Sequence, residues 1–183
     1  MMSHPWEISG RISVLTPVTS VTEAVAAVAA GASLVDVGDD DELIPAIRDA
    51  RREVRISGRG AGDHIADIVG DAGLAARSGA GLICPDPDAA ARAVRSGISA
   101  ERIVLTAAPA GIPAAVRSGW AVLADVDEGT GSAAEAEAVA AVCGWLGASI
   151  IRTRHVAGVR RCLDMTESIL GRRPPARALR GLA

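Results

Sequence analysis

The chain contains no lysine, no phenylalanine and no tyrosine, and its only aromatic side chains are three tryptophans. Because all 19 basic residues are arginines, a lysine Schiff base, a P-loop lysine and a lysine general acid or base are excluded. The scarcity of aromatic rings argues against a site that stacks nucleic-acid bases on side chains. Ala, Val, Ile and Leu must therefore fill the core.

Cysteine and histidine are scarce as well. Cys84, Cys143 and Cys162 are an odd number without a C-x-x-C spacing, which argues against a disulfide framework or a zinc site and predicts reduced thiols. His4 and His64 stand isolated in the sequence. Neither is predicted to be a ligand, and no metal site is predicted.

The charge and the chain ends limit the partners. A net charge of −3 argues against a general nucleic-acid binder. The first residues show no basic segment followed by an apolar run, and the longest apolar stretch, Val21–Val37, contains Glu23 and Asp36. No signal peptide or membrane span is predicted, and we expect a cytoplasmic protein. Residues 1–171 are predicted to form one domain, and residues 172–183 a basic tail with paired prolines.

Short β-branched runs alternate with Ala-rich segments that have helical spacing. Ser20 with Glu23 and Ser132 with Glu135 fit capping boxes at helix starts. Such alternation predicts a parallel α/β fold. The glycine-rich segment after residue 57 lacks the G-x-G-x-x-G spacing of a dinucleotide site, so a (β/α) TIM-type barrel is favoured over an open sheet. Seven strands are predicted: Arg11–Leu15, Ser33–Val37, Val54–Ser57, Gly81–Cys84, Arg102–Leu105, Ala121–Val126 and Ser149–Thr153.

Ligands of parallel α/β folds collect at the carboxyl ends of the strands. Arg152 lies inside the last predicted strand, which is followed by a helix N-terminus, and there a guanidinium and free helix N–H groups can together bind an anion. The alternative is that Arg152 pairs with Asp125 or another acidic strand end. The other polar candidates near strand ends are Thr16, Asp36, Ser57, Arg59, Asp86, Thr106, Asp125, Asp127, Arg154 and His155.

Some of these candidates also have a structural explanation. Asp36 ends an otherwise apolar strand, so its carboxylate is either a site residue or the partner of an arginine. For His155, a solvated position at a helix start is the favoured interpretation. The acidic runs 39–42 and 125–128 could bind a metal, but a helix start and a solvated loop, respectively, are favoured.

The C-terminal stretch GWLGASIIRTRHVAGVRRCLDM, Gly144–Met165, is similar to the last strand and helix of the dihydropteroate synthase family, which carry an R-x-H-D-V and an R-R-x-L-D-M pattern. TEAVAAVAAGASLVDVG (Thr22–Gly38), GISAERIVL (Gly97–Leu105) and LTP (Leu15–Pro17) resemble other parts of that family in the same order. The resemblance implies a (β/α) barrel that binds pterin in its interior and diphosphate near the last strand, and that joins the pterin to p-aminobenzoate. It also implies Arg152 as the diphosphate ligand.

The chain departs from the family at the positions that carry the chemistry. The Asn and Asp of the first loop fall on Val14 and Val18, and a pterin-contacting Asp falls on Gly58. The second loop is replaced by residues 38–42. The fourth-strand N-D-V becomes residues 84–86 without the Asn, and the sixth-strand D-P-G becomes residues 106–108 without the Asp. The seventh-strand S-R-K is absent, and the last His position holds Arg154 with His155 one residue later.

These departures lead to three hypotheses. The first is a shortened synthase-like protein without synthase activity, which binds a pterin-like or phosphorylated ligand or acts through a partner; it predicts anion binding that depends on Arg152. The second is an active transferase of the same family, for which Asp36, Asp86 and Asp125 would converge. The third is a non-catalytic scaffold. No cofactor is predicted, and Mg²⁺ is expected only with a bound diphosphate.

The count of strands bears on assembly. The family has eight strands, and the chain is predicted to lack one strand and one helix between Cys84 and Gly97. A barrel of seven strands would close, stay open, or cover its edge with a second chain. A homo-oligomer is therefore predicted.

Overall fold

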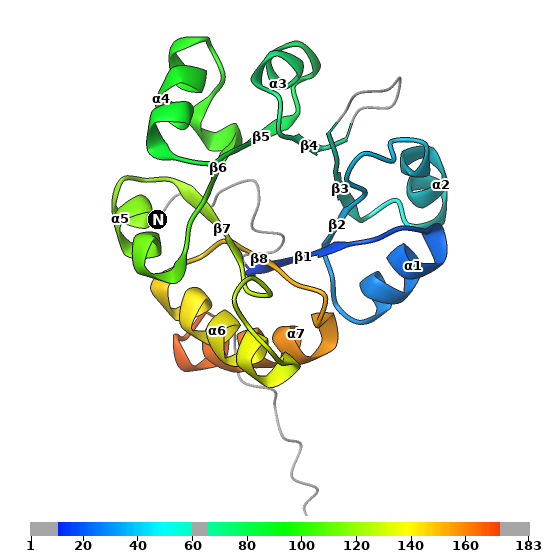
Figure 1. Ribbon diagram of the computed structural model, residues 1–183, viewed down its shortest axis with the longest axis vertical. Coiled ribbons are helices and arrows are strands. Elements are labelled where there is room, and N and C mark those ends of the chain that lie inside the picture. Colours follow the sequence, from blue (N-terminus) through cyan, green and yellow to red (C-terminus); the bar gives the residue numbers. More distant parts are fainter. Residues whose placement is uncertain (1–10, 60–65, 173–183) are drawn as a thin grey trace, which may run out of the picture.

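Eight parallel strands close into a barrel in the computed structural model, which describes residues 11–59 and 66–172 (Figure 1). Each strand pairs with the next in the sequence, and β8 pairs with β1. The predicted TIM-type (β/α) barrel is confirmed. His4, His64 and the tail beyond residue 172 lie outside the described residues. The strands are β1 Ser13–Pro17, β2 Leu34–Asp36, β3 Arg55–Ser57, β4 Ile68–Val69, β5 Gly81–Cys84, β6 Ile103–Thr106, β7 Ala121–Asp125 and β8 Ile150–Arg152.

Helices surround the barrel (Figure 1). Within the described residues an α-helix follows every strand except β3. In the same residues no helix is long and apolar enough to cross a membrane. The helices are α1 Val21–Ala29, α2 Leu43–Ala50, α3 Ala72–Ser78, α4 Pro87–Arg95, α5 Ile112–Arg117, α6 Ala133–Leu146 and α7 Val156–Ile169, with 3₁₀ turns η1 Ala100–Arg102 and η2 Pro109–Gly111.

The predicted count of seven strands was wrong by one. The missed strand is β4, whose two residues, Ile68 and Val69, are fully buried but are too few to show a period in the sequence. The predicted loss of a strand and a helix between Cys84 and Gly97 was wrong as well, because Gly81–Cys84 is the fifth strand, not the fourth, and α4 alone leads from it toward β6. The barrel therefore closes with all eight strands and leaves no open edge.

Branched aliphatic side chains fill the inside of the barrel. One buried cluster consists of strand residues alone: Leu15, Leu34, Ile68, Val104, Ala121, Leu123 and Ile150, with Ile83 packed against it. Because side chains alternate along a strand, the residues two positions after Leu15, Leu34, Leu123 and Ile150 also point inward. Asp36, Asp125 and Arg152 are thereby placed on the inner wall of the barrel at its carboxyl end. Thr16, between Leu15 and Pro17, faces outward toward the helices.

The predicted capping boxes are present with one modification. The Ser20 hydroxyl accepts from the Glu23 N–H at 3.2 Å, and the Glu23 carboxylate reaches back to the N–H of Thr19, not of Ser20, at 2.7 Å. Ser132 caps the Glu135 N–H at 3.3 Å. Both boxes begin helices that flank α7 or pack on it, so they help to fix the surroundings of its N-terminus.

A buried ionic network ties α7 to the start of β1. Glu167 is 1% exposed, and its carboxylate accepts from the Ile12 N–H and from Arg160 Nη2, both at 2.7 Å. Arg160 also donates to the Ile12 carbonyl at 2.7 Å and to Asp164 at 2.7 Å, and Asp164 accepts from Arg11. These bonds fix the helix that follows β8, and so they fix where its N-terminus lies at the barrel mouth.

Candidate functional site

Three charged side chains meet on the inner wall of the barrel mouth. Arg152 of β8 donates to Asp125 of β7 at 2.8 Å and to Asp36 of β2 at 3.2 Å. Burial alone would lower the pKa of Arg152, but the hydrogen bonds and charges of Asp125 and Asp36 outweigh it, so the pKa lies above its usual value. We call Asp36, Arg152 and Asp125 the mouth triad. Its net charge is −1, and the pairing considered as the alternative for Arg152 and for Asp36 is present.

The acidic residues after β7 shape the neighbouring loops. Asp125 Oδ1 accepts from the N–H groups of Asp127 and Glu128 at 3.0 and 3.3 Å. Asp127 accepts from the Thr153 hydroxyl at 2.7 Å and from the Arg154 N–H at 2.6 Å. Both carboxylates are thus engaged with the protein. A polar cavity of about 400 Å³ lies above them, lined by Pro17, Asp125, Asp127, Glu128, Arg152 and Arg154.

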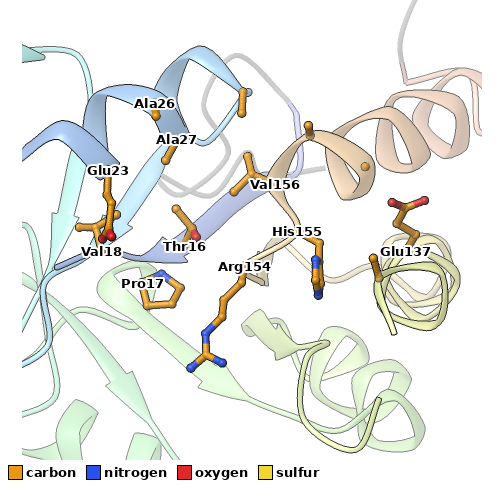
Figure 2. A pocket seen from close by; sticks show the side chains of 14 residues that line it. Thr16, Pro17, Val18, Glu23, Ala26, Ala27, Glu137, Arg154, His155 and Val156 are labelled. Carbon is orange, nitrogen blue, oxygen red and sulfur yellow. The ribbon is translucent and has the colours of Figure 1, made fainter. Parts of the chain in front are cut away.

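A second cavity, of about 490 Å³, lies beside the start of α7 (Figure 2). We call it the α7 groove. Thr16, Glu23, Arg154, His155 and Glu137 contribute its polar groups, and most of the other lining residues are alanines: Ala26, Ala27, Ala30, Ala133 and Ala157. Arg154 lines this groove and the mouth cavity alike.

The α7 groove contains hydrogen-bond donors that the described protein does not use. Thr16 is only 4% exposed, yet its hydroxyl has no partner among residues 11–59 and 66–172, and the same holds for the Arg154 guanidinium. His155 is the N-cap of α7 but forms no side-chain cap bond. The first-turn N–H groups of α7 are consequently without a described acceptor, as helix starts are when no side chain caps them. Unused donors beside the positive end of a helix dipole favour an anion.

The other predicted site residues do not join this arrangement. Asp86 is the N-cap of α4, where its carboxylate accepts from the Ala89 N–H at 2.6 Å. Arg59 forms an exposed ion pair with Asp39 at 2.8 Å. Ser57 and Thr106 are the last residues of β3 and β6. Of the three carboxylates required for an active transferase, the mouth triad therefore contains Asp36 and Asp125, while Asp86 caps a helix.

Glu137 is a site residue that sequence reasoning missed. It extends from α6 toward α7, where a Cβ added to Gly158 would lie 1.7 Å from its Oε1 (Figure 2). Its described polar contact is with the Cys162 thiol, at 4.0 Å. No sequence signal marks it, because a glutamate on a surface helix is ordinary and its proximity to α7 depends on the packing of two helices.

Metal-ligating groups do not cluster in the part of the chain that the structure describes: no set of three or more His, Cys, Asp or Glu there could hold an ion. The acidic run before α2 leads into the helix, with Glu42 at the N-cap. Cys84 and Cys143 are buried, and burial raises the pKa of each thiol. They are thus kept protonated and unreactive.

Solved structures share this architecture. The chain is similar to Mycobacterium tuberculosis Rv1207, with a TM-score of 0.74 and 26% identity over 91% of this chain and 95% of that one. It is also similar to the dihydropteroate synthase from Xanthomonas albilineans in complex with 7,8-dihydropteroate (TM-score 0.75, 16% identity, 87% of this chain and 94% of that one). The enzyme from Thermus thermophilus in complex with 6HMPPP gives a TM-score of 0.71 and 18% identity over 88% and 94% of the two chains. No protein-family model and no curated protein sequence matches the chain. The resemblance seen in the sequence is therefore matched in three dimensions, and the chain has the barrel fold of the dihydropteroate synthases.

Proposed function

We propose that this protein is a dihydropteroate-synthase-like barrel that binds a small phosphorylated ligand without catalysing the synthase reaction. The anionic group lies in the α7 groove, against Arg154, Thr16, His155 and the first-turn N–H groups of α7. The observation that carries the proposal is the difference in pairing between two arginines that lie two residues apart. Arg152 is engaged by two carboxylates, whereas Arg154 has a free guanidinium among the described residues.

The mouth triad argues against Arg152 as the anion ligand. The two negative charges of Asp36 and Asp125 already exceed the single positive charge of Arg152. An anion that binds Arg152 would have to displace at least one of these carboxylates. Breaking a partly buried ion pair leaves an uncompensated charge, which is costly. Arg154 has no such competitor at its guanidinium among the described residues, so it offers a full positive charge to the ligand.

The residues that line the inside of the barrel mouth argue against synthase activity. At the two positions where the resembled family carries an Asp, just after β3 and at the end of β6, the chain has Gly58 and Thr106, and neither offers a carboxylate to the edge of a pterin ring. A buried pterin would leave polar groups unpaired, at about 1–3 kcal/mol each. Two such losses weaken binding by a factor of about 30 or more.

Calorimetric titration tests the proposal. Diphosphate should bind the parent protein, and 6-hydroxymethylpterin diphosphate should bind no more than a few times better. Replacing Arg154→Ala removes a charge-assisted bond and should weaken both by about tenfold or more. Arg117→Ala, which removes an exposed charge at the end of α5, is the matched control and should change neither. Strong preference for the pterin compound, followed by turnover with p-aminobenzoate, would overturn the proposal.

Self-association is a second property that one observation favours. Val142 and Trp145 of α6 and Met165 and Ile169 of α7 are all more than half exposed, on two helices that pack against each other. Large exposed apolar side chains on adjoining helices mark candidate interaction surfaces. A homo-oligomer formed through α6 and α7 should sediment as a species larger than one chain, and Trp145→Arg should shift it to the monomer. A monomeric parent protein would contradict this.

A further inference from the structure

We propose that the α7 groove takes a zwitterionic ligand, whose ammonium group contacts Glu137 while its anionic group occupies the donors around Arg154. This inference rests on the anion site of the proposed function and narrows its ligand to phosphorylated amines. It follows from the position of Glu137 in the same cavity as the free donors.

Glu137 is a carboxylate without a cationic partner in the described part of the chain. Its one described polar contact is the Cys162 thiol at 4.0 Å, and a thiol is a weak donor. The side chain is only partly exposed. The other acidic residue of the groove, Glu23, is in a different situation, since its Oε2 already accepts from the N–H and the hydroxyl of Thr19. Glu137 is therefore the group available to a ligand cation.

The position of Glu137 decides between a plain anion and a zwitterion. Its carboxylate packs directly against Gly158, in the first turn of α7, so it lies next to the N–H groups that would bind the anion. A plain anion there is attracted by Arg154 and the helix but repelled by Glu137. A ligand that carries an ammonium group beside its anionic group is attracted by both, because unlike charges then face each other at each end.

The groove supports this assignment independently of the helix end. Thr16 is 4% exposed, its hydroxyl has no partner among the described residues, and it lines the same cavity from β1 (Figure 2). A volume of about 490 Å³ lies in the range of small-molecule sites. The lining between the polar groups is supplied largely by alanines, among them Ala26, Ala27 and Ala157, so a short methylene linker between the two charges meets an apolar wall.

The test is a calorimetric comparison of phosphoethanolamine with ethyl phosphate, which differ by the ammonium group. The parent protein should bind phosphoethanolamine about tenfold more tightly, as expected for one added charge-assisted contact. Glu137→Gln keeps the shape of the side chain and should remove that preference while leaving ethyl phosphate bound at least as well as before. Glu53→Gln, an exposed acid away from the groove, is the control and should keep the preference.

A second variant removes the Glu137 carboxylate from the groove without changing Glu137 itself. In Gly158→Ala the new methyl group occupies the place of the Glu137 carboxylate, which must swing away, and alanine suits a helix better than glycine. This variant should stay folded and also lose the preference. Equal binding of the two compounds to the parent, or a preference that survives both variants, overturns the zwitterion inference and leaves the anion site standing. If inorganic phosphate and both compounds all fail to bind, the anion site itself is refuted, and this inference with it.

Discussion

Removing Arg152 should destabilise the barrel far more than removing Arg154, although the two arginines lie two residues apart. Arg152→Ala breaks bonds of 2.8 and 3.2 Å and leaves Asp36 and Asp125 facing each other without a cation. The side chains are 37%, 18% and 22% exposed for Arg152, Asp36 and Asp125, so solvent screens part of the effect. The expected loss lies between the roughly 0.2–1 kcal/mol of an exposed pair and the roughly 3–5 kcal/mol of a broken buried pair, at about 2 kcal/mol.

Urea unfolding measures this loss. With a denaturant slope of about 2 kcal/mol/M for a domain of this size, Arg152→Ala should lower the midpoint by about 1 M. Arg154→Ala, whose guanidinium has no described partner, should lower it by less than about a quarter of that. Adding Asp36→Asn to Arg152→Ala should recover part of the loss, because one of the two facing charges is then gone. Equal midpoints for the two arginine variants would refute the assignment of Arg152 to the triad.

Three further predictions concern the helices around the site. Gly144→Ala places a Cβ 2.9 Å from Leu163 and 3.0 Å from Ile12. Although alanine has the better helix propensity, this crowding should lower the free energy of unfolding in urea by about 1–3 kcal/mol. An unchanged urea midpoint would contradict the close packing of α6 on α7. Arg160→Ala leaves the buried Glu167 carboxylate without its cation and should cost about 3–5 kcal/mol, seen as a lower melting temperature. Burial alone would raise the pKa of Asp164, but Arg11 and Arg160 outweigh it and lower the pKa. The stability that ionised Asp164 adds is therefore complete above its unfolded pKa of about 3.9, and it is lost as the pH falls through the lower folded pKa. In Asp164→Asn the free energy of unfolding should fall less steeply as the solution is acidified. An unchanged acid dependence would disprove the link.

The barrel could be predicted from the sequence because its signals are local. Seven strands are long enough to show β-branched runs, and Ser20 and Ser132 mark helix starts. Each of these signals depends on only a few neighbouring residues. β4 was missed because Ile68 and Val69 give no period, and their burial comes from neighbours across the sheet.

The site was harder to predict because it depends on distances across the fold. The sequence placed Asp36, Asp125 and Arg152 at strand ends, and parallel strands bring such ends to one mouth. It could not decide whether Arg152 binds an anion or a carboxylate, since that depends on all three side chains pointing inward at the same height. Glu137 could not be found at all, because only the packing of α6 on α7 brings it to the groove.

The most direct test of the account is a crystal structure of the protein grown with diphosphate. We predict that the anion lies in the α7 groove, within hydrogen-bond distance of the Arg154 guanidinium, the Thr16 hydroxyl and the first N–H groups of α7, with the mouth triad unbroken. A diphosphate bound to Arg152, with Asp36 or Asp125 displaced from it, would contradict the central claim and return the site to the position that the family resemblance implies.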